Sequence, residues 1–346
     1  MKWPLIIGFS LALLLILGRF IIYSPSIISQ FNLLSNGTNR SLAPTLPNVN
    51  SNGKVLSLTI TRPDPKPISS TTSTKSSATT TSTRATLLKW GAYVGDGEQN
   101  LANFETLVGK PVDFYADFES WDNDFPSQLS QRVGQQHKTL IIFWEPDFGY
   151  DDINNGSKDN YIRSFAAAAQ TYGYPIILVP FDEMNLNEEA WGYGQNHNTP
   201  AKFQQAWIRI HGLFSVATNV KFGLDFNNVS IPDVNGNHYI DYYPGSAYVD
   251  YLGADGFNFG DPQQNFTTIF DTILKKLAAY RKPIYIFSLA CIAGPSKAAW
   301  ISDGLGIKIY NYPYVAGWIW FNQGGYPNWL VNSDPNSLRA FRSIIP

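Results

Sequence analysis

The chain has 346 residues and a formal net charge of -2, and 15% of its residues are charged. This near-neutral balance excludes the basic face by which proteins bind nucleic acid. The single cysteine, Cys291, excludes a disulfide within the chain, and the four scattered histidines lack metal-ligand spacing, so we expect no metal and no cofactor.

The N-terminal 23 residues are predicted to form a membrane anchor. Residues 5–23 are apolar except for Arg19, and a stretch of this length is long enough to cross a bilayer. The Ser24–Ile27 region that follows lacks the small-x-small pattern of a signal-peptide cleavage site. We therefore expect an uncleaved signal-anchor, with the rest of the chain on the extracellular face. The alternative is cleavage of this segment, which leaves a secreted protein.

Residues 24–86 are predicted to form a flexible linker. The run from Ser69 to Thr83 consists almost entirely of serine and threonine. Such a composition cannot bury enough apolar surface to fold, and it is typical of extracellular stalks that hold a domain away from a membrane.

Residues 87–346 show the alternation of short apolar runs and longer amphipathic segments expected of one folded domain. The length is close to the roughly 250 residues that are usual for a (β/α)8 barrel. The predicted strands are Trp90–Val94, Val112–Ala116, Thr139–Trp144, Ile176–Pro180, Lys221–Asp225, Val249–Phe257, Pro283–Ala290 and Val315–Phe321.

Helices are predicted between several of these strands, which gives the α/β class and a (β/α)8 TIM barrel. An open, doubly wound sheet is the second choice, because no Gly-rich phosphate turn follows the first strand. The predicted helices are Asp159–Tyr172, Ala201–Ala217, Asn265–Tyr280, Lys297–Tyr310 and Ser337–Ile344.

Polar residues follow nearly every predicted strand, where a barrel of this kind carries its chemistry. These candidates are Asp117, Glu119, Glu145, Asp182, Glu183, Asn185, Asp225, Asn227, Asp255, Asn258, Ser288, Asn322 and Gln323.

Glu183 stands out among these candidates, because it follows the apolar strand Ile176–Pro180. A carboxylic acid in apolar surroundings has a raised pKa and can donate a proton to a glycosidic oxygen near neutral pH. Asn185 is suited to hydrogen-bond a sugar 2-hydroxyl. From the residues alone, a helix N-cap or a salt-bridged strand end is the first interpretation, and a catalytic acid is the second.

The region around Glu183 resembles the acid/base motif of glycoside hydrolase family 26, which contains β-mannanases and some β-glucanases and xylanases. The likeness rests on Pro180–Asn185 followed by Trp191–Gly194, and it extends over nearly all of residues 87–346. The resemblance implies a TIM barrel that acts on a β-linked polysaccharide, mannan-like in the first place, with Glu183 as the acid/base. The further matching segments are Gly91–Gly95, Phe143–Pro146, Ala206–His211, Asn219–Val220, Tyr243–Gly245, Val249–Gly253, Lys282–Ile284 and Asn328–Trp329.

The chain departs from the family pattern at the nucleophile. The family has a Glu a few residues after Lys-Pro-Ile, whereas this chain has Ser288 at that position. The family also has a Tyr near the end of the sixth strand, where this chain has Phe257. A serine hydroxyl without a neighbouring base cannot replace the anionic nucleophile of a retaining glycosidase.

Three interpretations of this departure stay open. The domain is a carbohydrate-binding relative with impaired or lost turnover, or Asp225, Asp255 or Glu145 acts as the base of an inverting reaction. The third interpretation is a shifted alignment at Ser288, but no Glu follows Glu189 anywhere in the chain.

Aromatic residues make up 15% of the chain, and several stand at or near predicted strand ends, where they could form the floor of sugar subsites. Trp207 lies within a helix and is assigned to the core. We expect a polysaccharide as the ligand, the membrane as a second partner and a monomeric chain. The predicted substrate-binding residues are Asn185, Trp191, Tyr193, Trp144, Phe257, Asn258 and Trp320.

Overall fold

The computed structural model describes residues 88–95 and 98–346. The predicted anchor at 1–23 and the predicted linker at 24–86 lie outside the described residues. Within the described residues, no helix combines the length and the apolar character needed to cross a membrane.

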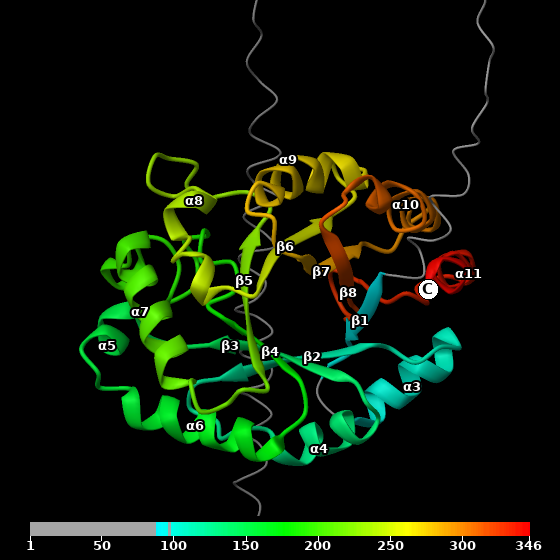
Figure 1. The fold of residues 1–346 in the computed structure, drawn as a ribbon. Helices are drawn as coiled ribbons and strands as arrows, with labels where there is room; N and C mark the ends of the chain where they lie inside the picture. Colours follow the sequence, from blue (N-terminus) through cyan, green and yellow to red (C-terminus); the bar gives the residue numbers. More distant parts are fainter. Residues whose placement is uncertain (1–87, 96–97) are drawn as a thin grey trace, which may run out of the picture.

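The described residues form a closed barrel of eight parallel strands in the order β1 to β8, and β8 pairs with β1 to complete it. The architecture confirms the predicted (β/α)8 TIM barrel (Figure 1). The strands are β1 (Lys89–Tyr93), β2 (Phe114–Ser120), β3 (Thr139–Glu145), β4 (Ile176–Pro180), β5 (Val220–Asn227), β6 (Tyr251–Asn258), β7 (Ile284–Cys291) and β8 (Val315–Phe321).

Helices surround the strands as an outer ring (Figure 1). The α-helices of the described part are α3 (Glu98–Val108), α4 (Ser127–Gln135), α5 (Tyr150–Asn154), α6 (Asp159–Tyr172), α7 (Pro200–Leu213), α8 (Tyr239–Tyr242), α9 (Phe266–Ala278), α10 (Lys297–Gly304) and α11 (Pro335–Ile344). The short 3-10 helices are η1 (Gln195–His197), η2 (Ser246–Tyr248) and η3 (Lys308–Asn311).

Local sequence explains where the longer helices begin. The Thr199 hydroxyl accepts a hydrogen bond from the Lys202 N–H at the start of α7, and Asp334 caps α11 by accepting from the Ser337 N–H. A proline follows each of these caps, in the position where the missing N–H costs nothing.

Alternating side chains of each strand point to two separate cores. Ile319 in β8 packs in the small cluster inside the barrel, whereas Trp318 and Trp320 pack in the large cluster between the strands and the helices. The same alternation places Phe143 inside and Trp144 outside in β3. This alternation decides which residues can reach the mouth of the barrel.

A bulge in β7 changes this alternation next to β6. Ala254 pairs with Ile286, but the next residue of β6, Asp255, pairs with Ser288, so Phe287 is an extra residue. The Phe287 ring nevertheless lies in the inner cluster. The bulge therefore brings Ser288 into register with the carboxyl-bearing residue of β6.

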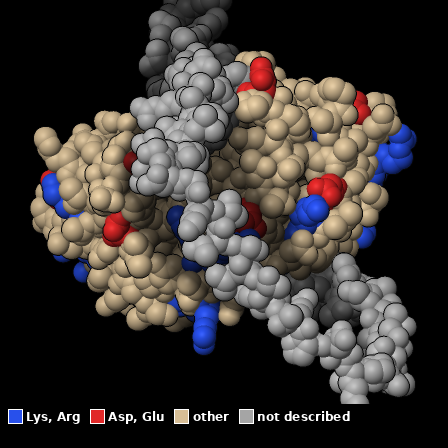
Figure 2. Space-filling view, turned by 90° about the horizontal axis from the view of Figure 1, so that it is seen from above, with Lys and Arg blue, Asp and Glu red and all other residues tan. Residues whose placement is uncertain are grey.

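The face of the molecule that carries α9 is mostly uncharged. On the part of this face that is visible in Figure 2, lysine, arginine, aspartate and glutamate side chains are scattered among uncharged residues. This view agrees with the low share of charged residues in the sequence.

Candidate active site

Glu183 lies just beyond the carboxyl end of β4, as the sequence predicts. Phe181 and Glu183 have φ values of 60° and 52°, in the left-handed region that non-glycine residues rarely adopt. Such strain is most often found at functional sites, where the surroundings hold it in place. The half-buried Glu183 carboxylate accepts a hydrogen bond from the Asn227 amide at 2.7 Å. Burial raises the pKa of Glu183 to about 7.

The Asn185 side chain hydrogen-bonds to the protein backbone and does not face the mouth of the barrel. Its side chain has no exposed surface, and its amide donates to the Asn227 and Val229 carbonyl oxygens at 3.0 and 2.8 Å. Its amide oxygen accepts from the Asn227 N–H at 3.0 Å. Asn185 therefore fixes the end of β5, and Asn227 is the residue that contacts Glu183. The sugar contact expected of Asn185 does not fit this placement.

Three further carboxyl groups lie beside Glu183, and burial raises the pKa of each. They belong to Asp182 after β4, Asp225 in β5 and Asp255 in β6. Mutual repulsion among these groups and from Glu183 adds to the rise. The acidic rim of the barrel therefore opposes the loss of protons from these carboxyl groups.

Ser288 occupies the floor of the same region. It is 4% exposed, and its N–H donates to the Asp255 carboxylate at 2.5 Å. The structure therefore brings Ser288 together with Glu183, Asp225 and Asp255 at the carboxyl ends of β4 to β7.

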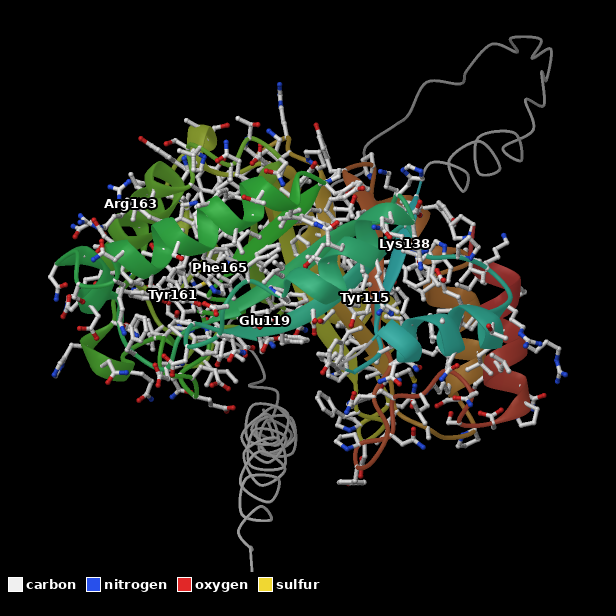
Figure 3. All side chains as sticks on the ribbon, turned by 90° about the horizontal axis from the view of Figure 1, so that it is seen from below. Tyr115, Glu119, Lys138, Tyr161, Arg163 and Phe165 are labelled. Carbon is white, nitrogen blue, oxygen red and sulfur yellow. The ribbon has the colours of Figure 1, made fainter. Side chains whose placement is uncertain are left out.

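Trp144 and Trp320 are not at the mouth of the barrel. Both rings are fully buried in the layer between strands and helices. The Trp144 ring stacks on Trp121, with ring centroids 4.0 Å apart, and lies 4.7 Å from the ring of Phe165 of α6, which is labelled in Figure 3. Trp320 packs against Phe341 of α11. Both rings therefore pack between strands and helices. The predicted sugar contact of Trp144 and Trp320 was wrong, because both side chains point to the outer side of their strands.

Trp191 and Tyr193 lie in the loop that follows Glu183. The Trp191 ring is 5% exposed, and its indole N–H donates to the Asp182 carbonyl oxygen at 2.8 Å. Tyr193 is half-buried. Trp191 thus holds the strained turn in place, and Tyr193 keeps part of its surface exposed.

Phe257 and Asn258 end β6 and face opposite sides. Asn258 is fully buried, and its amide oxygen accepts from the Gly260 and Gln264 N–H groups, each at 3.1 Å. These hydrogen bonds hold the loop after β6. Because its side chain is buried and used in this way, Asn258 does not make the predicted contact with a sugar. Phe257 is half-buried, and its ring centroid lies 5.7 Å from that of Phe321.

An aromatic group inside the barrel is absent from the residues predicted from the sequence. Tyr93, Phe118 and Phe321 contact one another, with ring centroids 4.9 Å apart for Tyr93 and Phe118 and 5.0 Å apart for Tyr93 and Phe321. Phe118 and Phe321 are half-buried. Phe257 contacts Phe321 from β6, the strand that also carries Asp255. The sequence of β8 could have predicted this, because side chains alternate along a strand. If Ile319 points into the barrel, then Phe321 does so as well and Trp320 does not.

One hollow in the surface lies away from the acidic rim. It has a volume of about 450 Å³ and is lined by residues that include Asp271 of α9, Tyr312 and Tyr314. Because Tyr314 precedes β8, this hollow lies at the amino ends of the strands. The chemistry of such barrels lies at the carboxyl ends, so the acidic rim is the candidate site.

A closed parallel barrel with acids and amides at its carboxyl rim is the architecture of many hydrolases. Residues 153–322 match the model of glycosyl hydrolase family 26. The chain is 34% identical over 276 residues to Endoglucanase H of Acetivibrio thermocellus. This alignment covers 75% of the chain, and the chain spans only 30% of the length of that relative. The barrel belongs to glycosyl hydrolase family 26.

Solved structures agree with this assignment at the level of the fold. The catalytic domain of a family 26 endo-β-1,4-mannanase from Bacillus sp. JAMB-750 superposes with a TM-score of 0.60 at 16% identity, covering 76% of this chain and 87% of that chain. An endo-β-1,4-mannanase double mutant from Cellulomonas fimi gives a TM-score of 0.58 at 13% identity, covering 75% and 71%.

Proposed function

We propose that the barrel hydrolyses a β-linked polysaccharide and that Glu183 donates the proton to the glycosidic oxygen. The observation that carries this proposal is the half-buried Glu183 carboxyl beyond β4, whose pKa burial raises to about 7. The hydrogen bond that it accepts from the Asn227 amide acts in the opposite direction but does not outweigh burial. A group with this pKa is protonated often enough at neutral pH to act as a general acid.

The proposed substrates are β-1,4-linked mannans and glucans. Mannan comes first, on the strength of the family resemblance and of the mannanases that share the fold. The name of the endoglucanase relative adds β-glucans. The aromatic group of Tyr93, Phe118, Phe257 and Phe321 offers apolar ring surface against which sugar rings can stack.

Release of reducing ends from a panel of mannans, β-glucans and xylans by the full chain tests the proposal. Glu183→Gln should lower turnover by about 10²- to 10⁴-fold, because proton donation is needed only in the transition state. Binding of the same polysaccharide should stay nearly unchanged. Turnover that is insensitive to Glu183→Gln contradicts the assignment of Glu183.

A glycan-binding protein without turnover is the second candidate function. Ser288 favours it, because a retaining glycosidase needs a carboxylate at that position. Polysaccharide binding with no reducing ends released from any member of the panel supports this candidate over hydrolysis.

We also propose that the chain is anchored to the membrane through residues 1–23 with the barrel on the extracellular face. The apolar stretch between Leu5 and Tyr23 supports this placement. Recovery of the full chain in the membrane fraction, and its release by protease added to intact cells, are the expected results.

A further inference from the structure

Asp225 and Asp255 form a carboxyl pair on neighbouring strands beneath Ser288. The two side chains are in hydrogen-bonding contact, and Asp255 also accepts the Ser288 N–H at 2.5 Å. Gly253 makes room for the pair, because a Cβ at that position would lie 2.5 Å from Asp225 Oδ1. The β7 bulge supplies the Ser288 contact, since it is what pairs Ser288 with Asp255.

The pair holds together only if it binds a proton. Apart from the Phe226 N–H and the Asp255 carboxyl, no hydrogen-bond donor lies beside the Asp225 carboxyl in the part of the chain that the structure describes. Two carboxylates in contact repel each other, and one proton shared between them turns the repulsion into a hydrogen bond. With one proton bound, the pair carries one negative charge next to Ser288.

Only one side of the pair is open to water. Asp225 has no exposed surface, whereas Asp255 and Ser288 are each 4% exposed. The other groups that face the pair are Asp182 and Glu183, both from the segment after β4. Asp182 is buried, and its Oδ1 atom receives no hydrogen bond among the described residues.

We propose that Asp255 is the general base of an inverting hydrolysis at this site and that Asp225 is its positioning residue. The proposal rests on the hydrolysis proposed above. The oxygen of a water molecule bonds to the anomeric carbon, and its proton passes to the Asp255 carboxylate. The glycosidic C–O bond breaks with its electron pair on the leaving oxygen, which takes the proton of Glu183. Exchange with solvent then returns both groups to their starting states.

The serine favours water as the attacking group. A serine side chain ends at Oγ and is much shorter than glutamate, so it leaves the approach to Asp255 open. Inverting glycosidases separate their two carboxyl groups by roughly 6.5–9.5 Å to admit this water, whereas retaining enzymes keep them about 5–5.5 Å apart. An aspartate side chain is also one methylene group shorter than the glutamate of the family, which leaves room for this water.

The configuration of the first product tests the mechanism. Cellohexaose and mannohexaose are mixed with the full chain, and the anomeric proton signals are followed by NMR before mutarotation. We expect α-configured reducing ends first. Asp255→Asn should lower turnover at least about 10²-fold. The exposed Asp233→Asn is the matched control and should leave turnover unchanged.

Asp225→Asn tests the positioning role through the pH profile. Asp225 is in contact with Asp255 and shares its proton, so the replacement should move the acidic limb of the kcat/KM profile. A purely structural role would lower kcat without moving that limb. Melting temperatures of all variants show whether each is folded.

β-Cellobiosyl and β-mannobiosyl fluoride separate the base from the acid, because fluoride leaves without a proton. Wild type and Glu183→Gln should release fluoride, and Asp255→Asn should not. A β-configured first product, fluoride release by folded Asp255→Asn, or no release by wild type overturns the role of Asp255. If a β-configured product appears and Glu183→Gln still abolishes hydrolysis of the polysaccharide, the proposed function stands without this base.

Discussion

At the scale of single residues, the acid form of Glu183 is the one that the mechanism uses. Its pKa of about 7 means that the donating proton is lost as the pH rises through that value. We therefore expect kcat on a β-glycan to fall tenfold for each pH unit above about 7. A pH–rate profile of wild type checks this limb, and a limb that persists unchanged in residual Glu183→Gln activity would show that another group causes it.

The raised pKa of Glu183 also predicts that its ionised form lowers the free energy of unfolding at neutral pH. Folding raises the pKa of Glu183 from 4.5 to about 7, so the folded state binds the proton more tightly. The contribution of Glu183 to the free energy of unfolding is complete below pH 4.5 and is lost as the pH rises through 7. Glu183→Gln should remove this loss and raise stability at pH 8 by up to about 3 kcal/mol, since each pKa unit is worth about 1.4 kcal/mol. Urea unfolding at pH 5 and pH 8 measures the difference.

Ser288→Glu distinguishes the two accounts of the missing nucleophile. If Asp255 is the base, a new carboxyl next to it adds a further negative charge to a crowded acidic rim, and both turnover and melting temperature should fall. If the site is a relic with intact acid and subsites, Ser288→Glu should create or raise activity with retention, alone or together with Phe257→Tyr. Initial rates and product configuration of the single and double variants decide between them.

At the scale of elements, strand composition predicted most of the barrel. The predicted ranges of β4 and β8 coincide with the observed ones, and so does the range of α6. The second strand was predicted at Val112–Ala116 but runs over Phe114–Ser120, because its polar end residues are held by pairing with β3 and not by apolar content. The helices α3, α4, α5 and α8 were not predicted.

The prediction of site residues failed where it depended on the side of a strand. Glu183, Asp225 and Asp255 are found at the rim because carboxyl ends of parallel strands meet there. Trp144 and Trp320 also end their strands, but each is one residue out of phase with the inward positions. The bulge at Phe287 could not be predicted from alternation, because it is an interruption of that alternation.

α10 holds a buried lysine whose pH dependence can be measured. Lys297 has no exposed surface, and its ammonium group donates to the Leu330 carbonyl oxygen at 2.7 Å. Burial lowers its pKa from 10.5 to about 8. The unfolded chain then binds the proton more tightly, so this group adds to stability above pH 10.5 and the addition is lost as the pH falls through 8. Lys297→Met should remove this dependence.

Thermal unfolding of Lys297→Met between pH 7 and pH 10 measures the effect. The matched control is Lys275→Met in α9, whose side chain is 70% exposed and pairs with Asp271. The control should follow the wild-type pH dependence. An unchanged slope in Lys297→Met would contradict the assignment to Lys297.

At the scale of the whole molecule, the barrel depends on close approach of its first and last strands. Gly317 of β8 pairs with Lys89 of β1, and a Cβ at position 317 would run into the Lys89 carbonyl oxygen and the Tyr285 ring. Gly317→Ala should therefore lower the free energy of unfolding by about 3 kcal/mol or more. Gly294→Ala is the control, because an added Cβ there meets nothing within 4 Å. Denaturant unfolding of both variants measures the difference and so tests whether β1 and β8 pack too closely at Gly317 to admit a side chain.

The β7 bulge also has a consequence for how the sequence can change over evolutionary time. The extra residue turns the Phe287 ring toward β5 and β6, where it occupies the space that side chains at Gly223 and Gly253 would need. These three positions share one volume, so a larger residue at either glycine requires a smaller one at 287. Among relatives that pair a serine with an aspartate as Ser288 and Asp255 do here, the three positions should covary, and relatives without the bulge should be released from that constraint.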